Sequence, residues 1–205
     1  MNKIIIIDWN GTLIRKNILD RATVLRGESI SSDENHKESL KKFSGIMDEE
    51  LLTIELTHLL NVYYMHMVNL EGEEIFYPEV LKYLNKWSAG GYKLFIVSNM
   101  WKRTVETTLE LMGISHLFEG IYGNTQNLIY DKKSLIEMII TDVGKPCIYI
   151  GDDVEDVDAA KKTGIKSGIV TWGRPWTWDD YPEYLMDTFH EVNNLIELYE
   201  DLKEI

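Results

Sequence analysis

Short apolar runs rich in β-branched residues, separated by helical patterns, constrain the fold of this chain more than any other feature. They span residues 4–7, 94–97, 147–150 and 167–170, with a weaker run at 120–122. Consecutive apolar positions are typical of strands buried on both faces of a parallel sheet. Helical periodicity separates the runs, over residues 78–89, 101–112, 132–141 and 156–163. The sequence therefore predicts an α/β fold, a doubly wound, Rossmann-like parallel sheet of about five strands.

The stretch between the first strand and Pro78 carries no strand signal. Its helical periodicity is clearest over residues 48–68, whereas the polar residues 29–39 indicate a loop. Pro78 is expected to open the next helix, and Gly90 with Gly91 to close it. We expect two domains: an α/β core of residues 1–15 and 76–205, and a small α-helical cap of residues 16–75 inserted into it.

Charge and composition limit the partners of the chain. The 21 basic and 34 acidic residues give a net charge of -13, which repels nucleic acid and anionic membrane surfaces. An anionic substrate would then need a local cation, from a metal or from lysine and arginine. The single cysteine, Cys147, excludes an intrachain disulfide, and the apolar run at 4–7 is too short for a signal peptide or membrane span. We expect a cytoplasmic protein, and the sequence leaves its oligomeric state open.

Polar side chains follow the first strand where it ends. Asp8 and Asn10 come directly after the run at 4–7, beside Gly11, which permits a tight turn. Open α/β sheets bind ligands at this edge. Taken alone, Asp8 and Asn10 could equally serve only to end the strand.

Two further strands also end in polar groups. Ser98 and Asn99 follow the run at 94–97, and both can hydrogen-bond an anion. The run at 147–150 is followed by Gly151 and then by four closely spaced carboxylates, Asp152, Asp153, Glu155 and Asp156. Such a cluster favours a hard cation such as Mg²⁺, although acidic residues also decorate helix N-termini without one. All three segments are expected at one edge of the sheet.

Together these segments resemble the haloacid dehalogenase superfamily of phosphotransferases, in its phosphoglycolate phosphatase-like branch with a helical cap. The matching features are Asp8-x-x-Gly-Thr after the first strand, an apolar strand ending in Ser98, a lysine leading a helix, and Gly151-Asp-x-x-x-Asp. The resemblance covers residues 1–15 and 76–195 and leaves the insert largely unmatched. It implies a Mg²⁺-dependent phosphatase that acts on a small phosphorylated metabolite.

The resemblance also implies a role for each matching residue. Asp8 would attack phosphorus to form an aspartyl-phosphate, Ser98 would hydrogen-bond the phosphoryl group, and Lys132, or Lys133 one residue later, would neutralise it. Catalytic roles fall to Asp8, Asn10, Ser98 and Lys132, and substrate contacts to Trp9, Gly11, Thr12, Ser98, Asn99 and Lys132. Mg²⁺ would be held by Asp8, the main-chain carbonyl of Asn10, Asp152 directly and Asp156 through water, with Asp153 a possible additional ligand.

Asn10 departs from the family pattern. Phosphatases of the superfamily usually carry a second aspartate there, which protonates the leaving alcohol and then activates water. An amide cannot transfer a proton at neutral pH, and general acid–base catalysis contributes about 10²- to 10⁴-fold. Three alternatives remain: a substrate with a good leaving group, an acid supplied by another residue, or a ligand-binding protein with little turnover.

A phosphonatase is a further alternative, because such enzymes also lack this aspartate. It would need a Schiff-base lysine from the cap, for which Lys16, Lys37, Lys41 and Lys42 are candidates by residue type alone. A haloacid dehalogenase is less favoured, since it would not need the acidic cluster at 152–156.

Overall fold

The chain divides into two compact units, residues 1–15 with 76–205, and residues 16–75. A computed structural model describes residues 3–22, 49–125, 128–173 and 184–201. The predicted loop at 29–39 lies outside these residues, as do Lys37, Lys41 and Lys42. The two units are described separately below.

The first unit is built on a six-stranded sheet in the order β3-β2-β1-β4-β5-β6, in which all neighbours are parallel. The strands are β1 (Ile4–Asp8), β2 (Lys93–Trp101), β3 (Phe118–Asn124), β4 (Ile148–Gly151), β5 (Lys166–Val170) and β6 (Tyr184–Met186). The predicted α/β fold is confirmed, with one strand more than the five apolar runs indicate. β6 was not predicted because its three residues include no β-branched side chain.

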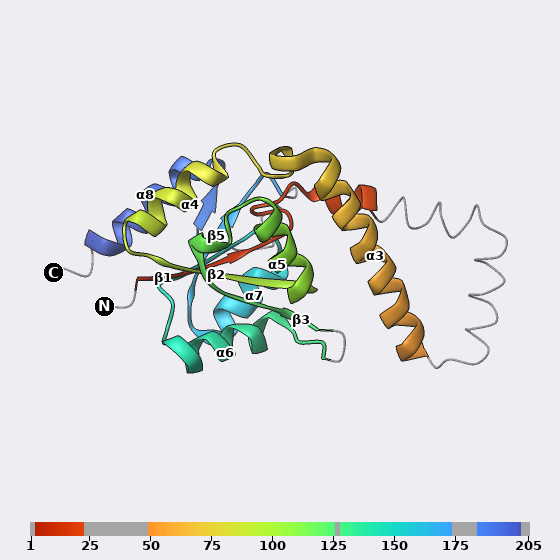
Figure 1. Ribbon diagram of the computed structural model, residues 1–205. Helices are drawn as coiled ribbons and strands as arrows, with labels where there is room; N and C mark the ends of the chain where they lie inside the picture. The colour runs from red at the N-terminus through yellow and green to blue at the C-terminus, as the bar shows by residue number, and fades with distance from the viewer. Residues whose placement is uncertain (1–2, 23–48, 126–127, 174–183, 202–205) are drawn as a thin grey trace, which may run out of the picture. The chain divides into compact units, whose positions relative to one another are not determined.

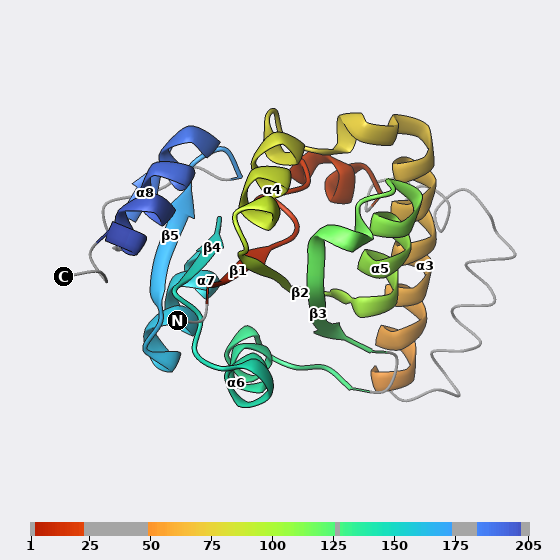
Figure 2. The same cartoon turned by 60° about the vertical axis from the view of Figure 1, so that its left-hand side comes forward.

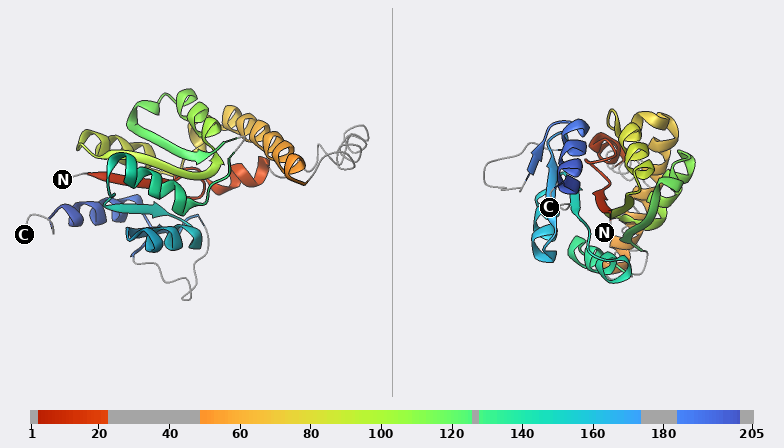
Figure 3. Two further views of the ribbon diagram at one scale, coloured as in Figure 1. Left: turned by 90° about the horizontal axis from the view of Figure 1, so that it is seen from below. Right: turned by 90° about the vertical axis from the view of Figure 1, so that its left-hand side faces the viewer.

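Helices cover both faces of the sheet (Figures 1 and 2). α4 (Val80–Ala89), α5 (Lys102–Leu111) and α8 (Phe189–Asp201) lie on one face, with the short η2 (Ser115–Leu117) preceding β3. α6 (Lys132–Val143) and α7 (Val154–Thr163) lie side by side on the other (Figure 3). Gly90 caps α4 as predicted, but α4 begins two residues after Pro78, because Glu79 has a φ of 66° that no α-helix accepts.

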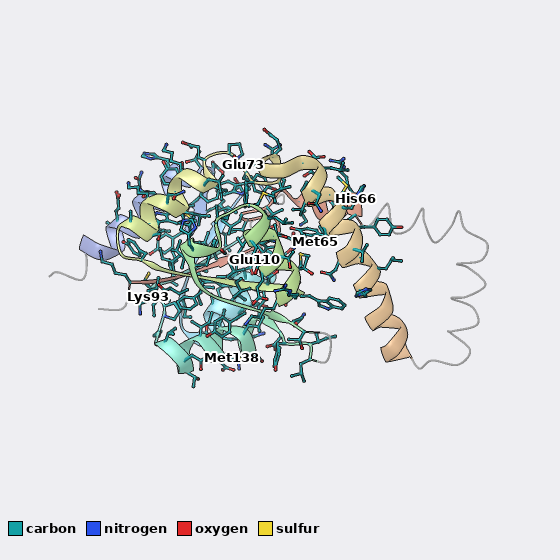
Figure 4. All side chains as sticks on the ribbon, viewed as in Figure 1. Met65, His66, Glu73, Lys93, Glu110 and Met138 are labelled. Atoms are coloured by element: carbon teal, nitrogen blue, oxygen red, sulfur yellow. The ribbon has the colours of Figure 1, made fainter. Side chains whose placement is uncertain are left out.

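Alternation along the strands divides the core between these faces. Ile4 and Ile6 of β1 pack with Leu135, Ile136 and other apolar residues of α6 and α7. On α6 itself, Met138 points away from the sheet and is 39% exposed (Figure 4). Because side chains two apart along a strand share a face, Asp8 follows Ile4 and Ile6 onto the α6 and α7 side. The fold thus turns the last carboxylate of β1 toward the start of α6.

The second unit contains a helical segment at residues 16–22, α3 (Glu49–Glu71) and the 3₁₀ turn η1 (Gly72–Ile75). α3 covers residues 49–68 of the predicted helical stretch at 48–68, and residue 48 lies outside the described residues. Arg21 forms an ion pair with Glu71, which links the first helical segment to the end of α3. Among the described residues, no helix combines the length and apolar character that crossing a bilayer requires.

Candidate active site

Strand register brings three predicted site residues to the same edge of the sheet. Asp8 pairs with Val97, directly before Ser98, and Ile7 pairs with Ile150, two residues before Asp152. Because β1, β2 and β4 are parallel neighbours, their carboxyl ends meet there. Asp8, Ser98 and Asp152 are all buried.

Lys132 places a positive charge among these carboxylates. Its Nζ donates to Asp8 Oδ1 at 2.9 Å and to Asp156 Oδ1 at 2.5 Å, and the residue is 5% exposed. Burial opposes the charge of Lys132, but the two carboxylates outweigh it and raise the pKa of the amine, so Lys132 is a permanent cation. Lys133 instead pairs with Glu137 at 2.6 Å on the outer side of α6. The two lysines that the sequence leaves open therefore lie in different environments, and only Lys132 contacts Asp8.

Asp8 is held in a desolvated, electronegative environment. Its pKa is raised to about 8: burial is the largest cause, Asp156 and Asp152 add to the rise, and Lys132 opposes it. Thr12 Oγ1 lies 3.4 Å from Asp8 Oδ2 and donates toward it. A nucleophilic carboxylate at this position needs positive charge beyond Lys132 to be ionised at neutral pH.

Asp156 organises the loop after β4. Its Oδ2 accepts the backbone N–H groups of Asp152 and Asp153, each at 3.0 Å. Its Oδ1 accepts from Lys132 and from the hydroxyl of Tyr149, each at 2.5 Å. Four donors occupy the lone-pair directions of a carboxylate. Asp156 therefore positions neighbouring groups.

The carboxylates fit a hard divalent cation. One oxygen from each of Asp8, Asp152 and Asp156 lies within 4.8 Å of the others, and this is the group among the described residues that could hold a metal. Ligands at about 2.1 Å from one Mg²⁺ lie at most about 4.2 Å apart, so Asp8 and Asp152 need only a small contraction to bind one ion, while Asp156 is assigned a contact through water. Asp153 is outside this group and is the N-cap residue of α7, and its role as an additional ligand stays a prediction.

Asn10 leaves a polar atom without a hydrogen bond. Its Oδ1 is shielded from solvent and has no hydrogen-bond partner among the described residues. Such an atom is costly unless a ligand, ion or water completes it. The buried amide oxygen is consistent with a polar ligand close to Asn10.

The remaining predicted substrate contacts differ in exposure. Ser98 Oγ accepts the backbone N–H of Met100 at 3.1 Å, which leaves its own proton available to an acceptor. Asn99 is exposed, and its side chain donates to Glu155 at 2.8 Å. Trp9 is fully buried, and its carbonyl accepts the N–H groups of Leu13 and Ile14. Of these three residues, Ser98 has the side chain best prepared to bind a phosphoryl oxygen.

Two glycines allow Asp152 to approach the loop after β1. Gly11 has a φ of 88°, and a Cβ there would lie 2.2 Å from Asp152 Oδ2. A Cβ on Gly173, after β5, would lie 2.3 Å from the same oxygen and 2.4 Å from the carbonyl of Gly11. Gly173 was not predicted as a site residue, because its role depends on a tertiary contact between loops distant in sequence.

We expect Gly173→Ala to lower the free energy of unfolding by about 1–3 kcal/mol, because the added methyl group must displace the backbone at Gly11 or the carboxylate of Asp152. Chemical denaturation measures the change. Gly90→Ala is the matched control, since its Cβ would meet Lys86 O at 3.3 Å, and should cost less than about 0.5 kcal/mol. Equal losses for the two variants would contradict this view of Gly173.

Trp172 and Tyr149 complete the surroundings of the site. Trp172 Nε1 donates to the carbonyl of Thr12 at 3.1 Å, and its ring packs on Phe189 with centroids 4.7 Å apart. Tyr149 was not predicted as a site residue, because an aromatic residue inside an apolar strand is usually core. The signal that could have identified it is the alternation of side chains along a strand. Tyr149 lies two residues before Gly151, so both residues are on the same face of the sheet, the face that α7 covers.

The known proteins that are similar to this chain include phosphatases and haloacid dehalogenase-like hydrolases. The curated relatives include a phosphoglycolate phosphatase from Colwellia psychrerythraea, 29% identical over 161 residues, which cover 73% of this chain and 70% of the relative. Another, from Aquifex aeolicus, is 24% identical over 214 residues and covers 97% of both. A solved haloacid dehalogenase-like hydrolase from Streptococcus pneumoniae superposes with a TM-score of 0.70 at 20% identity, covering 95% of this chain and 98% of that one.

The family model for haloacid dehalogenase-like hydrolases matches residues 5–170, which include β2 to β5, all of β1 except Ile4, and every residue of the candidate site except Gly173 and Trp172. This match spans well over half of the chain, and the predicted resemblance is confirmed. The chain belongs to the haloacid dehalogenase-like hydrolase family and is an enzyme of that family.

Proposed function

We propose that this enzyme is a Mg²⁺-dependent phosphatase that acts on a small phosphorylated metabolite through an aspartyl-phosphate at Asp8. The observation that carries the proposal is the buried contact of Lys132 with both Asp8 and Asp156 beside Asp152. The names of the relatives, most of them phosphoglycolate phosphatases, support the same substrate class. We further propose that residues 16–75 form a cap and that the protein is cytoplasmic.

The proposed reaction has two steps. An oxygen of Asp8 forms a bond to phosphorus while the bond from phosphorus to the substrate oxygen breaks, which yields the aspartyl-phosphate and an alcohol or alkoxide. Water then attacks the phosphorus, releases inorganic phosphate and restores Asp8. Lys132 offsets the charge on the phosphoryl oxygens, and the Ser98 hydroxyl donates to one of them.

Asp8, Asp152 and the main-chain carbonyl of Asn10 would hold Mg²⁺, with Asp156 acting through water. When bound, Mg²⁺ supplies positive charge that favours the ionised form of Asp8 and offsets that of the phosphate. The raised pKa of Asp8 supports a requirement for such a charge. The match of three clustered carboxylates to an oxygen-binding cation supports the choice of metal.

Phosphate release from a panel of small phosphate monoesters, with Mg²⁺ and with excess chelator, tests the proposal. We expect hydrolysis of at least one compound with Mg²⁺ and its loss, by about 100-fold or more, on chelation, because the charge near Asp8 is then uncompensated. Restoring Mg²⁺ to the chelated sample is the control for irreversible damage. Hydrolysis that is indifferent to chelator, or a fully inert panel, would contradict the proposal.

The sequence also supports a second candidate, a ligand-binding protein with little turnover. Asn10 occupies the position of the usual acid and cannot transfer a proton. Calorimetric binding of a phosphate analogue with Mg²⁺, in the absence of any hydrolysis, would favour this candidate.

A further inference from the structure

Tyr149 is a buried tyrosine whose hydroxyl contacts Asp156, a carboxylate of the candidate site. It lies on β4 next to β1, with Tyr149 paired to Ile6, two residues before Asp8 on the same face. Its side chain has no exposed surface, and its hydroxyl donates to Asp156 Oδ1 at 2.5 Å. The hydroxyl is therefore a fixed hydrogen-bond donor.

The oxygen that Tyr149 contacts is also the oxygen that holds Lys132. Asp156 Oδ1 accepts from both Tyr149 and Lys132, while Lys132 divides its charge between Asp156 at 2.5 Å and Asp8 at 2.9 Å. A hydrogen bond to a carboxylate reduces its attraction for a second donor, because it disperses the negative charge. Without the phenol, Asp156 would draw Lys132 more strongly away from Asp8.

We infer that Tyr149 is a positioning residue, whose hydroxyl tunes Asp156 so that Lys132 remains available to Asp8 and to the phosphoryl group. The inference rests on the proposed phosphatase function but adds a residue that touches neither substrate nor metal. Removing the hydroxyl should slow the chemical step and leave substrate binding nearly unchanged, because Tyr149 contacts Asp156 and acts on the substrate only through Asp156 and Lys132.

Tyr149→Phe deletes the hydroxyl and keeps the ring. We expect kcat to fall about 10- to 100-fold, the range for loss of one charge-assisted hydrogen bond, with KM changed by less than about threefold. Tyr122→Phe is the matched control, because Tyr122 also donates to a carboxylate, that of Asp142, at 2.9 Å. Burial and that carboxylate raise the pKa of Tyr122 to about 12. Its ring packs against the core residues of β1, α6 and α7, among which Tyr149 also lies. Its kcat should equal that of the wild type.

Thermal unfolding separates positioning from a purely structural role. A Tyr149→Phe variant that melts at a lower temperature but retains wild-type kcat per folded molecule would overturn the inference. A rise in KM with kcat unchanged would overturn it as well. If the wild type itself hydrolyses no substrate, the proposed function fails first, and the kinetic comparison is replaced by the following measurement.

Beryllofluoride, a phosphoryl mimic, can be added with Mg²⁺ to protein labelled isotopically at tyrosine, and the ring resonances followed by NMR. Because Lys132 must shift toward the mimic on Asp8, we expect the Tyr149 resonance to move while that of Tyr122 stays. This measurement needs no variant that might fail to fold. Binding of the mimic with an unmoved Tyr149 resonance would overturn the inference, and absence of binding would count against the proposed function.

Discussion

Asp8→Asn is expected to abolish phosphate release, with a loss of on the order of 10⁴-fold or more. An amide at this position is a poor nucleophile, and Asp156, the other carboxylate that Lys132 contacts, is already occupied by four donors. The measurement is phosphate release with the best substrate of the panel, together with acid-quench trapping of labelled phosphate on the protein. Both signals should vanish in the variant.

Asp158→Asn is the matched control for Asp8→Asn. It makes the same chemical change on α7, two residues from Asp156, but its side chain is exposed. It should retain full activity. If Asp8→Asn hydrolyses substrate at more than a few per cent of the wild-type rate, the covalent mechanism is wrong, even if the enzyme remains a phosphatase.

The fold could be predicted largely from the sequence because its buried strands carry β-branched residues in uninterrupted runs. Ile4–Asp8 and Lys166–Val170 are found within one residue of the predicted runs. β6 was missed because a strand of three residues has too few positions to show a pattern. α8 was missed although Phe189, Val192 and Ile196 have helical spacing, since acidic residues dominate the last part of the chain.

The candidate site could be predicted from the sequence only in part. That Asp8, Ser98 and Asp152 meet follows from the parallel topology, which the sequence does predict. The choice between Lys132 and Lys133 does not follow from the topology, because consecutive side chains of a helix point about 100° apart. The phase of α6 is fixed by Asp131, whose side chain caps the helix by accepting Ser134 N–H at 2.7 Å.

The contact between Tyr149 and Asp156 could not be predicted from the sequence, although the strand that contains Tyr149 and the helix that contains Asp156 were both predicted. It depends on the distance between β4 and α7, which neither propensity nor periodicity reports. Residues that position others are harder to recognise from sequence than residues that carry chemistry, because their type is compatible with ordinary core packing.

Asn10→Asp is expected to raise kcat/KM for alkyl phosphates by about 10²-fold, within the range that general acid catalysis supplies. The new carboxyl group would occupy the place of an amide whose Oδ1 is buried without a hydrogen-bond partner among the described residues, so no existing interaction of that atom opposes the change. An aryl phosphate, whose leaving group needs no proton, should gain far less. The ratio of the two rates is therefore the decisive measurement.

Asn10→Ala separates proton transfer from simple removal of the amide, since it deletes the amide without adding an acid. It should show no gain with either substrate. A gain confined to Asn10→Asp and to alkyl phosphates would mean that the enzyme has the nucleophile and the cation of a general phosphatase but works on a substrate with a good leaving group. A loss with both substrates would give the amide a positive role, because a fourth carboxylate beside Asp8, Asp152 and Asp156 adds repulsion that Lys132 alone cannot offset.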